Sequence, residues 1–151
     1  MNRLAELLPT DHILLDIAAE GKQALFERIG TLFERLHGVN GAMVTKNLFA
    51  RETLGSTGLG AGVAIPHGRI KGLKQQLAAF VRLAEPIEFS SPDKKPVNLL
   101  FFLLVPEQAT QQHLETLSSI AQLLSDKIMR QALAEEPAAQ SVHNLLRDWK
   151  A

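Results

Sequence analysis

Cysteine is absent from the 151-residue sequence. This absence excludes disulfide bonds, thiolate catalysis and zinc sites with cysteine ligands, and it fits a reducing compartment. An excess of charge of one sign is also missing, because 16 basic residues balance 16 acidic ones. Nucleic-acid-binding domains usually gather lysine and arginine on one basic face. The composition therefore does not favour a nucleic-acid partner.

Long apolar segments are missing as well. A helix that spans a bilayer needs about 20 consecutive apolar residues, whereas the longest apolar run, Leu99–Val105, has the length of a strand. The first residues show no basic region followed by an apolar stretch, so no signal peptide is predicted. We therefore expect a soluble cytoplasmic protein without membrane insertion. The length and the lack of repeats or linkers predict one domain over residues 1–151.

The spacing of apolar residues predicts both helices and strands. Helical spacing predicts helices over residues 22–36, 40–53, 110–124 and 127–134, and a last helix with Pro137 in its first turn. Strands are predicted over residues 63–66, 76–84 and 97–105. The last of these is almost wholly apolar, so we expect a central strand that is buried on both faces. Helices combined with three or more strands predict an α/β sandwich.

Two further expectations concern details of these elements. Pro66 lacks a backbone N–H group, so the strand before it should end there or lie at an edge of the sheet. In the predicted helix over residues 110–124, one apolar stripe is expected along the side that packs on the protein. Its members are Leu114, Leu117, Ala121 and Leu124.

Four glycines lie within the eight residues from Gly55 to Gly62. Such a segment is expected to be a loop whose backbone can adopt positive φ angles. It lacks the Gly-Lys-Ser/Thr ending of a P-loop, and the strand-then-helix context of a dinucleotide fingerprint is missing. Taken alone, the segment is therefore a weak nucleotide signal and is more typical of a flexible turn.

His67 is the first candidate for chemistry, because it follows a predicted strand ending in Pro66 and precedes Gly68. At such a junction a functional group is displayed on a rigid support. An unperturbed histidine has a pKa of about 6.5, so much of it is neutral and nucleophilic at pH 7. A phosphoryl group on it would bring roughly −1.5 to −2 charge and would need cationic or amide donors. Candidate donors are Arg51, Ser56, Thr57, Arg69 and the glycine amides of the loop. The alternative is a histidine that caps a strand end.

His113 is the second candidate. Thr110 can cap the predicted helix and so place His113 in the first turn. The positive end of the helix dipole disfavours an imidazolium there, and a neutral ring could donate one hydrogen bond to an anion. The alternative is a partly buried histidine beside apolar neighbours. The remaining histidines, His12, His37 and His143, are expected to be structural or simply exposed.

Other reaction classes find little support. His67 and His113 are far apart in the sequence and no H-E-x-x-H spacing occurs, so no metal site is predicted. The G-x-S-x-G motif of a serine hydrolase is also missing. No cofactor is expected.

The segment Arg51–Arg69 (RETLGSTGLGAGVAIPHGR) resembles the active-site signature of type-2 enzyme IIA domains of the phosphotransferase system, the mannitol/fructose class. The residue sequence of its loop is most similar to that of the nitrogen-regulatory branch. The resemblance extends over nearly the whole chain, including Pro96–Phe101 and the helix start at His113. It implies a single domain with a mixed β-sheet flanked by helices.

The resemblance also assigns roles to residues. The phosphorylated histidine of the family falls on His67, with phosphate on Nε2. The second active-site histidine falls on His113, which would hydrogen-bond the phosphoryl group, and the arginine before the loop falls on Arg51. The phosphate-binding loop is implied to comprise Gly55, Ser56, Thr57, Gly58 and Arg69. The phosphodonor would be an HPr-like histidine phosphocarrier that is itself charged by enzyme I.

Three functions follow from these observations. The first is a phosphocarrier of the nitrogen phosphotransferase system whose phosphorylation state regulates partner proteins of nitrogen or potassium metabolism. The second is an enzyme IIA that passes phosphate to an enzyme IIB for uptake of a fructose- or mannitol-class sugar. The third is a small-ligand sensor that uses the glycine-rich loop independently of His67.

Overall fold

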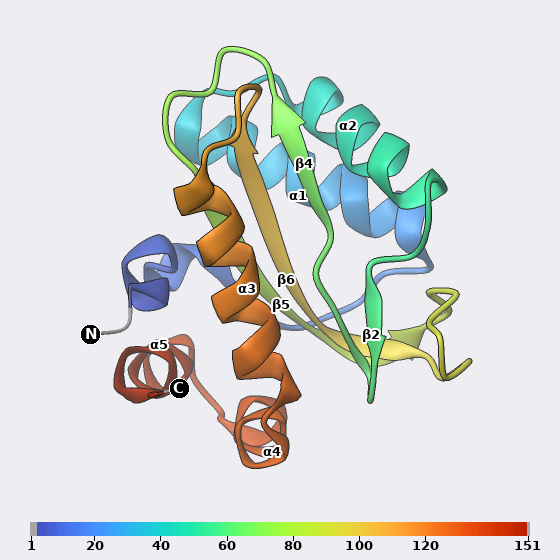
Figure 1. Cartoon of the computed structure of the whole chain (residues 1–151). Coiled ribbons are helices and arrows are strands. Elements are labelled where there is room, and N and C mark those ends of the chain that lie inside the picture. Colours follow the sequence, from blue (N-terminus) through green and yellow to red (C-terminus); the bar gives the residue numbers. More distant parts are fainter. Residues whose placement is uncertain (1–2, 151) are drawn as a thin grey trace.

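The computed structural model describes residues 3–150; residues 1–2 and 151, the ends of the predicted domain, lie outside the described part. The chain combines helices and strands (Figure 1). The helices are α1 (Lys22–His37), α2 (Gly41–Thr53), α3 (Gln111–Ser125), α4 (Lys127–Glu135) and α5 (Ala139–Asp148), with two short 3-10 helices, η1 (Leu4–Leu7) and η2 (Thr10–His12). The strands are β1 (Ile13–Ile17), β2 (Gly58–Gly60), β3 (Val63–Ala64), β4 (His67–Ile70), β5 (Leu77–Ile87) and β6 (Val97–Pro106).

The six strands form one mixed sheet in the order β1-β5-β6-β3-β2, and β4 also pairs with β6. Strands β5 and β6 are antiparallel, with Phe80 opposite Phe101. Strands β3 and β4 follow one another along β6, and both run parallel to it. The α/β fold with a mixed sheet that the sequence predicted is therefore confirmed.

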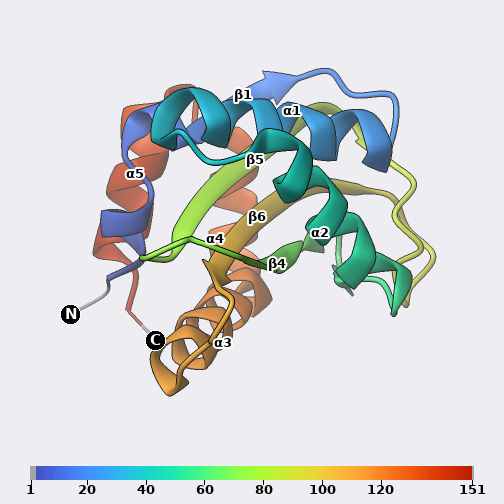
Figure 2. The same cartoon turned by 90° about the horizontal axis from the view of Figure 1, so that it is seen from above.

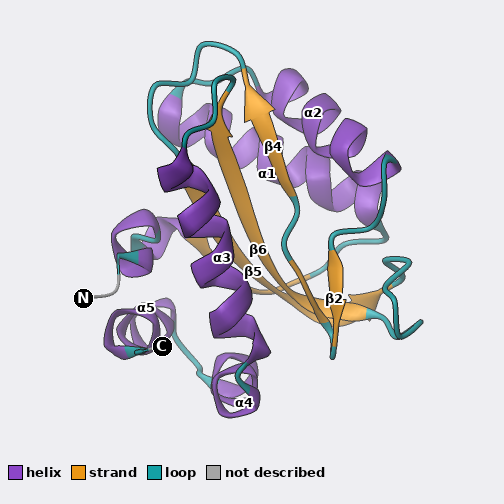
Figure 3. Ribbon diagram, in the orientation of Figure 1, coloured by secondary structure: helices purple, strands orange, loops and turns teal. Residues whose placement is uncertain are grey.

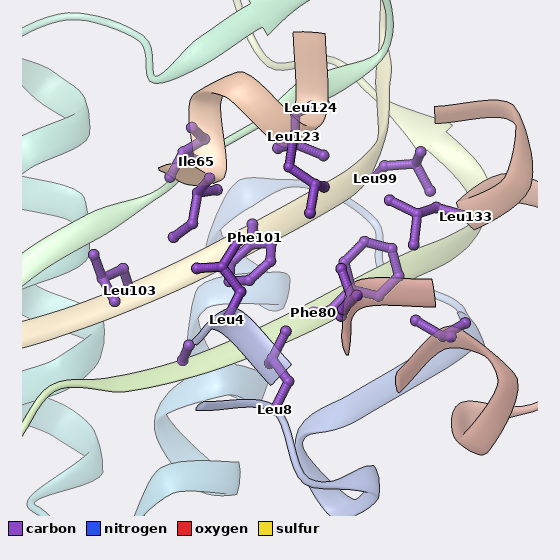
Figure 4. Packing of buried hydrophobic residues seen from close by; sticks show 14 of the residues in the cluster. Leu4, Leu8, Ile65, Phe80, Leu99, Phe101, Leu103, Leu123, Leu124 and Leu133 are labelled. Atoms are coloured by element: carbon purple, nitrogen blue, oxygen red, sulfur yellow. The ribbon is translucent and has the colours of Figure 1, made fainter. Parts of the chain in front are cut away.

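Helices cover both faces of the sheet (Figure 2). Helices α1 and α2 lie on one face, where their apolar side chains pack against Leu100, Phe102 and Leu104 of β6. Helices α3, α4 and α5 lie on the other face, against Phe101 and Leu103. Figure 4 shows the second of these clusters. Strand β6 is thus buried on both faces, as its continuous apolar sequence predicts.

The predicted helix boundaries are largely confirmed. Asn40 caps α2, since its side chain accepts a hydrogen bond of 3.0 Å from the Met43 N–H group. Two details were wrong. Leu114 is 59% exposed and is not part of the buried stripe of α3, and Pro137 precedes α5 rather than lying in its first turn. The stripe that packs on the sheet instead contains Leu117, Ile120 and Leu124.

The glycine-rich segment was predicted as a loop, but residues Gly58–Gly60 form the short strand β2 (Figure 3). It pairs with β3, and the turn between them has left-handed backbone at Gly60 and Gly62. His67 is likewise the first residue of a new strand rather than of a loop. The predicted strand over 63–66 ends at Ala64, and the chain resumes pairing with β6 directly after Pro66.

Strands β1, β2 and β4 were not predicted, because they have only five, three and four residues. None of the three alternates apolar and polar side chains along its length, so the strand pattern is missing. In the described part of the chain, no helix is long and apolar enough to cross a membrane.

Candidate functional site

His67 lies half-buried at the start of β4, directly opposite Leu103 of β6. Paired residues of neighbouring strands point to the same face of a sheet. Leu103 belongs to the apolar cluster beneath α3, so the imidazole of His67 faces the α3 side. Ile70 packs in the opposite cluster, against α1 and α2, as the alternation along β4 requires.

One hydrogen bond determines the tautomer of His67. Nδ1 lies 2.8 Å from the carbonyl oxygen of Ile65. A carbonyl only accepts hydrogen bonds, so Nδ1 carries the proton and the neutral ring keeps a lone pair on Nε2. Burial lowers the pKa of His67, and Arg51 lowers it further, while the Ile65 hydrogen bond and the charge of Glu52 act in the opposite direction. Near neutral pH His67 therefore presents an unprotonated Nε2, the form that a nucleophile needs.

The lowered pKa of His67 predicts a pH dependence of stability. In the unfolded chain a histidine takes up a proton near pH 6.5, and the folded protein resists that proton because the ring is buried. The unfolded state then binds more protons at low pH. The contribution of His67 to the free energy of unfolding is therefore complete above about pH 6.5 and is lost as the pH falls below it. Urea unfolding at a series of pH values should show this decrease. His67→Gln should decrease less over the same range, and an identical decrease in both proteins would contradict the assignment.

Arg51, at the end of α2, is close enough to His67 to affect its titration. Its Nη1 atom donates a hydrogen bond of 2.8 Å to the Gly55 carbonyl. A guanidinium carries five N–H donors in a planar fork, so this bond fixes the side chain and leaves donors for an anion. Arg51 thus connects the end of α2 to the glycine-rich segment.

The polar groups of the glycine-rich segment are engaged within the protein. The Ser56 hydroxyl donates to the Phe89 carbonyl (2.8 Å) and accepts from the Gly58 N–H group (3.0 Å). The Thr57 N–H and hydroxyl groups both donate to the carboxylate of Glu52. These residues were predicted as phosphate donors. In this structure their bonds hold the segment in shape.

His113 lies in the first turn of α3, as predicted, and its Nδ1 accepts a hydrogen bond of 2.9 Å from the Thr110 N–H group. An accepting Nδ1 in a neutral ring places the proton on Nε2. Because residues four and seven positions further on, Leu117 and Ile120, pack on the sheet, His113 lies on the same side of the helix. His113 and His67 therefore occupy the same face of the sheet. Nε2 of His113 carries a proton that can be donated, and Nε2 of His67 has a lone pair.

Arg69 lies two residues after His67 on β4, so it points to the same face. Its side chain is exposed, and its carbonyl accepts a hydrogen bond of 2.8 Å from the Asn47 side chain of α2. Gly68 between them packs on the backbone of α2, where an added Cβ atom would lie 3.4 Å from the Asn47 carbonyl oxygen. The close approach of α2 thus sets the position of β4 and of its two outward side chains.

The prediction missed two residues of this region, Glu52 and Lys22. Glu52 is buried, and Lys22 of α1 pairs with it at 3.0 Å. Both lie in helical sequence where charged side chains are ordinarily exposed. Only the position of Glu52 beside Arg51 is a signal of its importance.

The other three histidines have structural contacts, as expected. Nε2 of His12 and Nε2 of His37 are 2.7 Å apart, and Nδ1 of His143 lies 2.7 Å from the Leu8 carbonyl oxygen. Within residues 3–150, no group of three or more metal-ligating side chains could hold a metal ion.

A family model described as "Phosphoenolpyruvate-dependent sugar phosphotransferase system, EIIA 2" matches residues 6–149. The chain belongs to this enzyme IIA family. Among curated relatives, this enzyme IIA is 39% identical over 149 residues to the nitrogen regulatory protein of Pseudomonas aeruginosa, with 98% of this chain and 97% of that protein covered. It is 35% identical over 133 residues to the nitrogen regulatory protein of Escherichia coli K12, with 87% and 82% covered.

Solved structures give the same placement. The crystal structure of the nitrogen regulatory protein IIA-Ntr from Neisseria meningitidis matches this enzyme IIA with a TM-score of 0.90 and 51% identity, over 95% of this chain and 98% of that one. The mannitol IIA of Escherichia coli matches with a TM-score of 0.76 and 23% identity, over 92% and 98%, and shows the fold alone. The predicted resemblance to the nitrogen-regulatory branch is therefore confirmed.

Proposed function

We propose that this enzyme IIA is a phosphoryl carrier of a nitrogen phosphotransferase system and that it accepts phosphate on Nε2 of His67. The observation that carries the proposal is the 2.8 Å contact between Nδ1 of His67 and the Ile65 carbonyl oxygen. This contact directs the lone pair of a neutral ring outward from a rigid strand. The 39% identity to a nitrogen regulatory protein supports the choice of system.

The transfer step needs little covalent machinery. The Nε2 lone pair of His67 attacks the phosphorus atom of a phosphohistidine on the donor protein. The new N–P bond forms as the donor's N–P bond breaks, and the donor ring keeps that electron pair. Such a reaction depends on in-line positioning and on stabilisation of the charge of the transferred group. Because Nδ1 of His67 already holds its proton, His67 needs no separate base, and no metal or nucleotide is required of this chain.

Two neighbouring groups would stabilise the phosphoryl oxygens. Arg51 supplies a guanidinium fixed by Gly55, which suits the geometry of a phosphoryl group. His113 supplies an Nε2–H donor, because its Nδ1 is occupied by the Thr110 N–H group. Arg69 adds positive charge on the same face. Gly55, Ser56, Thr57 and Gly58 hold this constellation in place through their internal hydrogen bonds.

The donor would be an HPr-like histidine phosphocarrier charged from phosphoenolpyruvate by enzyme I. Four large apolar side chains of the described residues are exposed, and three of them adjoin the site in sequence. Leu54 follows the α2 segment of Arg51, Leu59 lies in β2, and Leu114 follows His113. We expect these three side chains to contact the donor protein.

The same face would transmit the signal. Phosphorylation adds roughly −1.5 to −2 charge, which weakens contact with acidic or apolar partners and favours basic ones. We therefore expect regulatory targets in nitrogen or potassium metabolism that distinguish the two forms, with the protein acting in the cytoplasm as a transferase component of the system. Transfer to an enzyme IIB for sugar uptake is the alternative.

The test is intact-mass spectrometry after incubation with phosphoenolpyruvate, enzyme I and an HPr-like carrier. We expect a gain of one acid-labile phosphoryl group. If the carrier phosphorylates another acceptor and this protein gains nothing, the proposal is wrong. Addition of an enzyme IIB and its sugar then separates the alternatives, because rapid sugar-dependent loss of the phosphate would favour the transport function.

His113→Ala should still accept phosphate but should pass it on more slowly. The variant removes one charged-group hydrogen bond, which contributes about 1.5–3 kcal/mol, so the transfer rate should fall by roughly 10–100-fold. Rapid-quench measurement of transfer from the phosphorylated protein back to the HPr-like carrier would show the change. His143→Ala is the matched control and should retain the wild-type rate. An unchanged rate for His113→Ala would remove its proposed role.

A further inference from the structure

Glu52 is a buried carboxylate that the proposed chemistry does not use. Its side chain is only 3% exposed, although it lies one residue from Arg51 near the end of α2. It accepts hydrogen bonds from the Thr57 hydroxyl (2.6 Å) and from the Thr57 N–H group (3.0 Å to Oε2). Lys22 of α1 donates a third, at 3.0 Å. Both carboxylate oxygens are therefore occupied by groups from two other segments.

These contacts fasten the glycine-rich segment from two sides. Glu52 holds Thr57 to α2, while the neighbouring Ser56 hydroxyl is bonded to the Phe89 carbonyl beyond β5. The Lys22 ammonium lies 4.3 Å from the centre of the Phe89 ring, so it joins the two anchors. A loop held at consecutive residues by buried partners has little freedom, and the Gly55 carbonyl that fixes Arg51 belongs to that loop.

Fastening alone does not explain a charged side chain. A glutamine oxygen could accept the Thr57 hydrogen bonds, although a neutral amide would leave the Lys22 ammonium without its counter-charge. The location of the charge supplies a reason. The charge of Arg51 lowers the pKa of His67, and the charge of Glu52 raises it. Lys22 pairs with the same carboxylate, and Arg69 of β4 and His113 of α3 lie on the sheet face to which His67 points.

We propose that Glu52 is a positioning residue for phosphoryl transfer, which fastens the loop through Thr57 and balances the charge of Arg51 at His67. The inference rests on the proposed function of His67. An unopposed guanidinium would hold a phosphoryl group tightly, which favours acceptance and disfavours release. The carboxylate repels the same group, so the pair leaves the phosphoryl group bound but transferable in both directions, as a carrier requires.

The charge role is tested with Glu52→Gln, which keeps one oxygen acceptor for Thr57 and removes the negative charge. The imidazole resonances of His67 are followed by NMR from pH 4 to 9 in the unphosphorylated protein. We expect the pKa of His67 to fall, because a neighbouring negative charge that favours the imidazolium is lost. Glu135→Gln, an exposed residue at the end of α4, makes the same change in net charge and should leave the titration unchanged. A titration of Glu52→Gln that coincides with wild type overturns the charge role.

The fastening role is tested with Thr57→Val, which keeps Glu52 and its charge but removes the hydroxyl bond. We expect the His67 titration to stay at the wild-type position while kcat for transfer from the HPr-like carrier falls about 10-fold and KM changes little, since loss of position acts on the chemical step. A wild-type kcat overturns the fastening role. If wild-type protein accepts no phosphate, the proposed function fails separately, because the titration of His67 needs no donor.

Discussion

His67→Ala is expected to accept no phosphate from a charged HPr-like carrier, whereas wild-type protein gains one acid-labile phosphoryl group. The substitution removes the only atom with the required lone pair at this position, the Nε2 atom, which the Ile65 hydrogen bond keeps unprotonated. The fold should survive. His67 is only half-buried, and loss of its hydrogen bond costs about 1 kcal/mol. Intact-mass spectrometry and far-ultraviolet circular dichroism of the same samples measure both results.

His37→Ala is the matched control for this experiment. His37 is also hydrogen-bonded through a ring nitrogen, to His12, but it is exposed at the end of α1. It should accept phosphate like wild type. An acid-labile phosphate on folded His67→Ala would place the acceptor elsewhere, with His113 as the next residue to substitute. A collapsed circular dichroism spectrum would contradict the conclusion that the fold tolerates the change.

Leu100→Ala should destabilise the protein by about 2–5 kcal/mol, the range for truncation of a fully buried leucine. Leu100 lies in the middle of β6, is 0% exposed, and packs in the cluster beneath α1 and α2. Neighbouring strands hold its backbone from both sides, at Val81 and Ala64, so the site cannot collapse around the cavity. Urea unfolding monitored by circular dichroism measures the change in the free energy of unfolding.

The control for Leu100→Ala is the same substitution at Leu54, which is 85% exposed. It removes the same atoms where they are hydrated in both states, so the change should stay within about 0.5 kcal/mol. A loss below about 1 kcal/mol for Leu100→Ala would mean that the face beneath α1 and α2 repacks easily, contrary to the central place of β6. Leu54→Ala also tests the donor surface, because its loss of contact area should raise KM for the HPr-like carrier.

Local patterns in the sequence were sufficient to predict the long helices and strands. An apolar run such as Val97–Val105 avoids water only if the strand is buried on both faces. Asn40 and Gly38 mark helix ends, because the Asn40 side chain caps a helix start and Gly38 adopts a left-handed backbone at a helix end. The short strands were different. Strand β2 was predicted as part of a loop because its glycines carry no hydrophobic pattern. It is a strand because β3 lies beside it and accepts its pairing.

The candidate site shows the same division. His67, His113 and Arg51 could be named from the motif and from the resemblance, since the nature of each side chain indicates its chemistry. Their states could not. The tautomer of His67 depends on the Ile65 carbonyl, and the role of Glu52 depends on Lys22, 30 residues away in the sequence. The donors of Thr57 were assigned to phosphate until the fold placed Glu52 beside them.

The sequence by itself determined the family, the core strands and the candidate nucleophile of this protein, because those follow from side-chain type and from short-range order. Only the tertiary structure decided which face His67 points to, which of its ring nitrogens carries the proton, and which charges act on it. Electrostatic effects and hydrogen bonds depend on distance in space rather than along the chain. Packing of α2 against β4 and of α3 against β6 is what sets those distances.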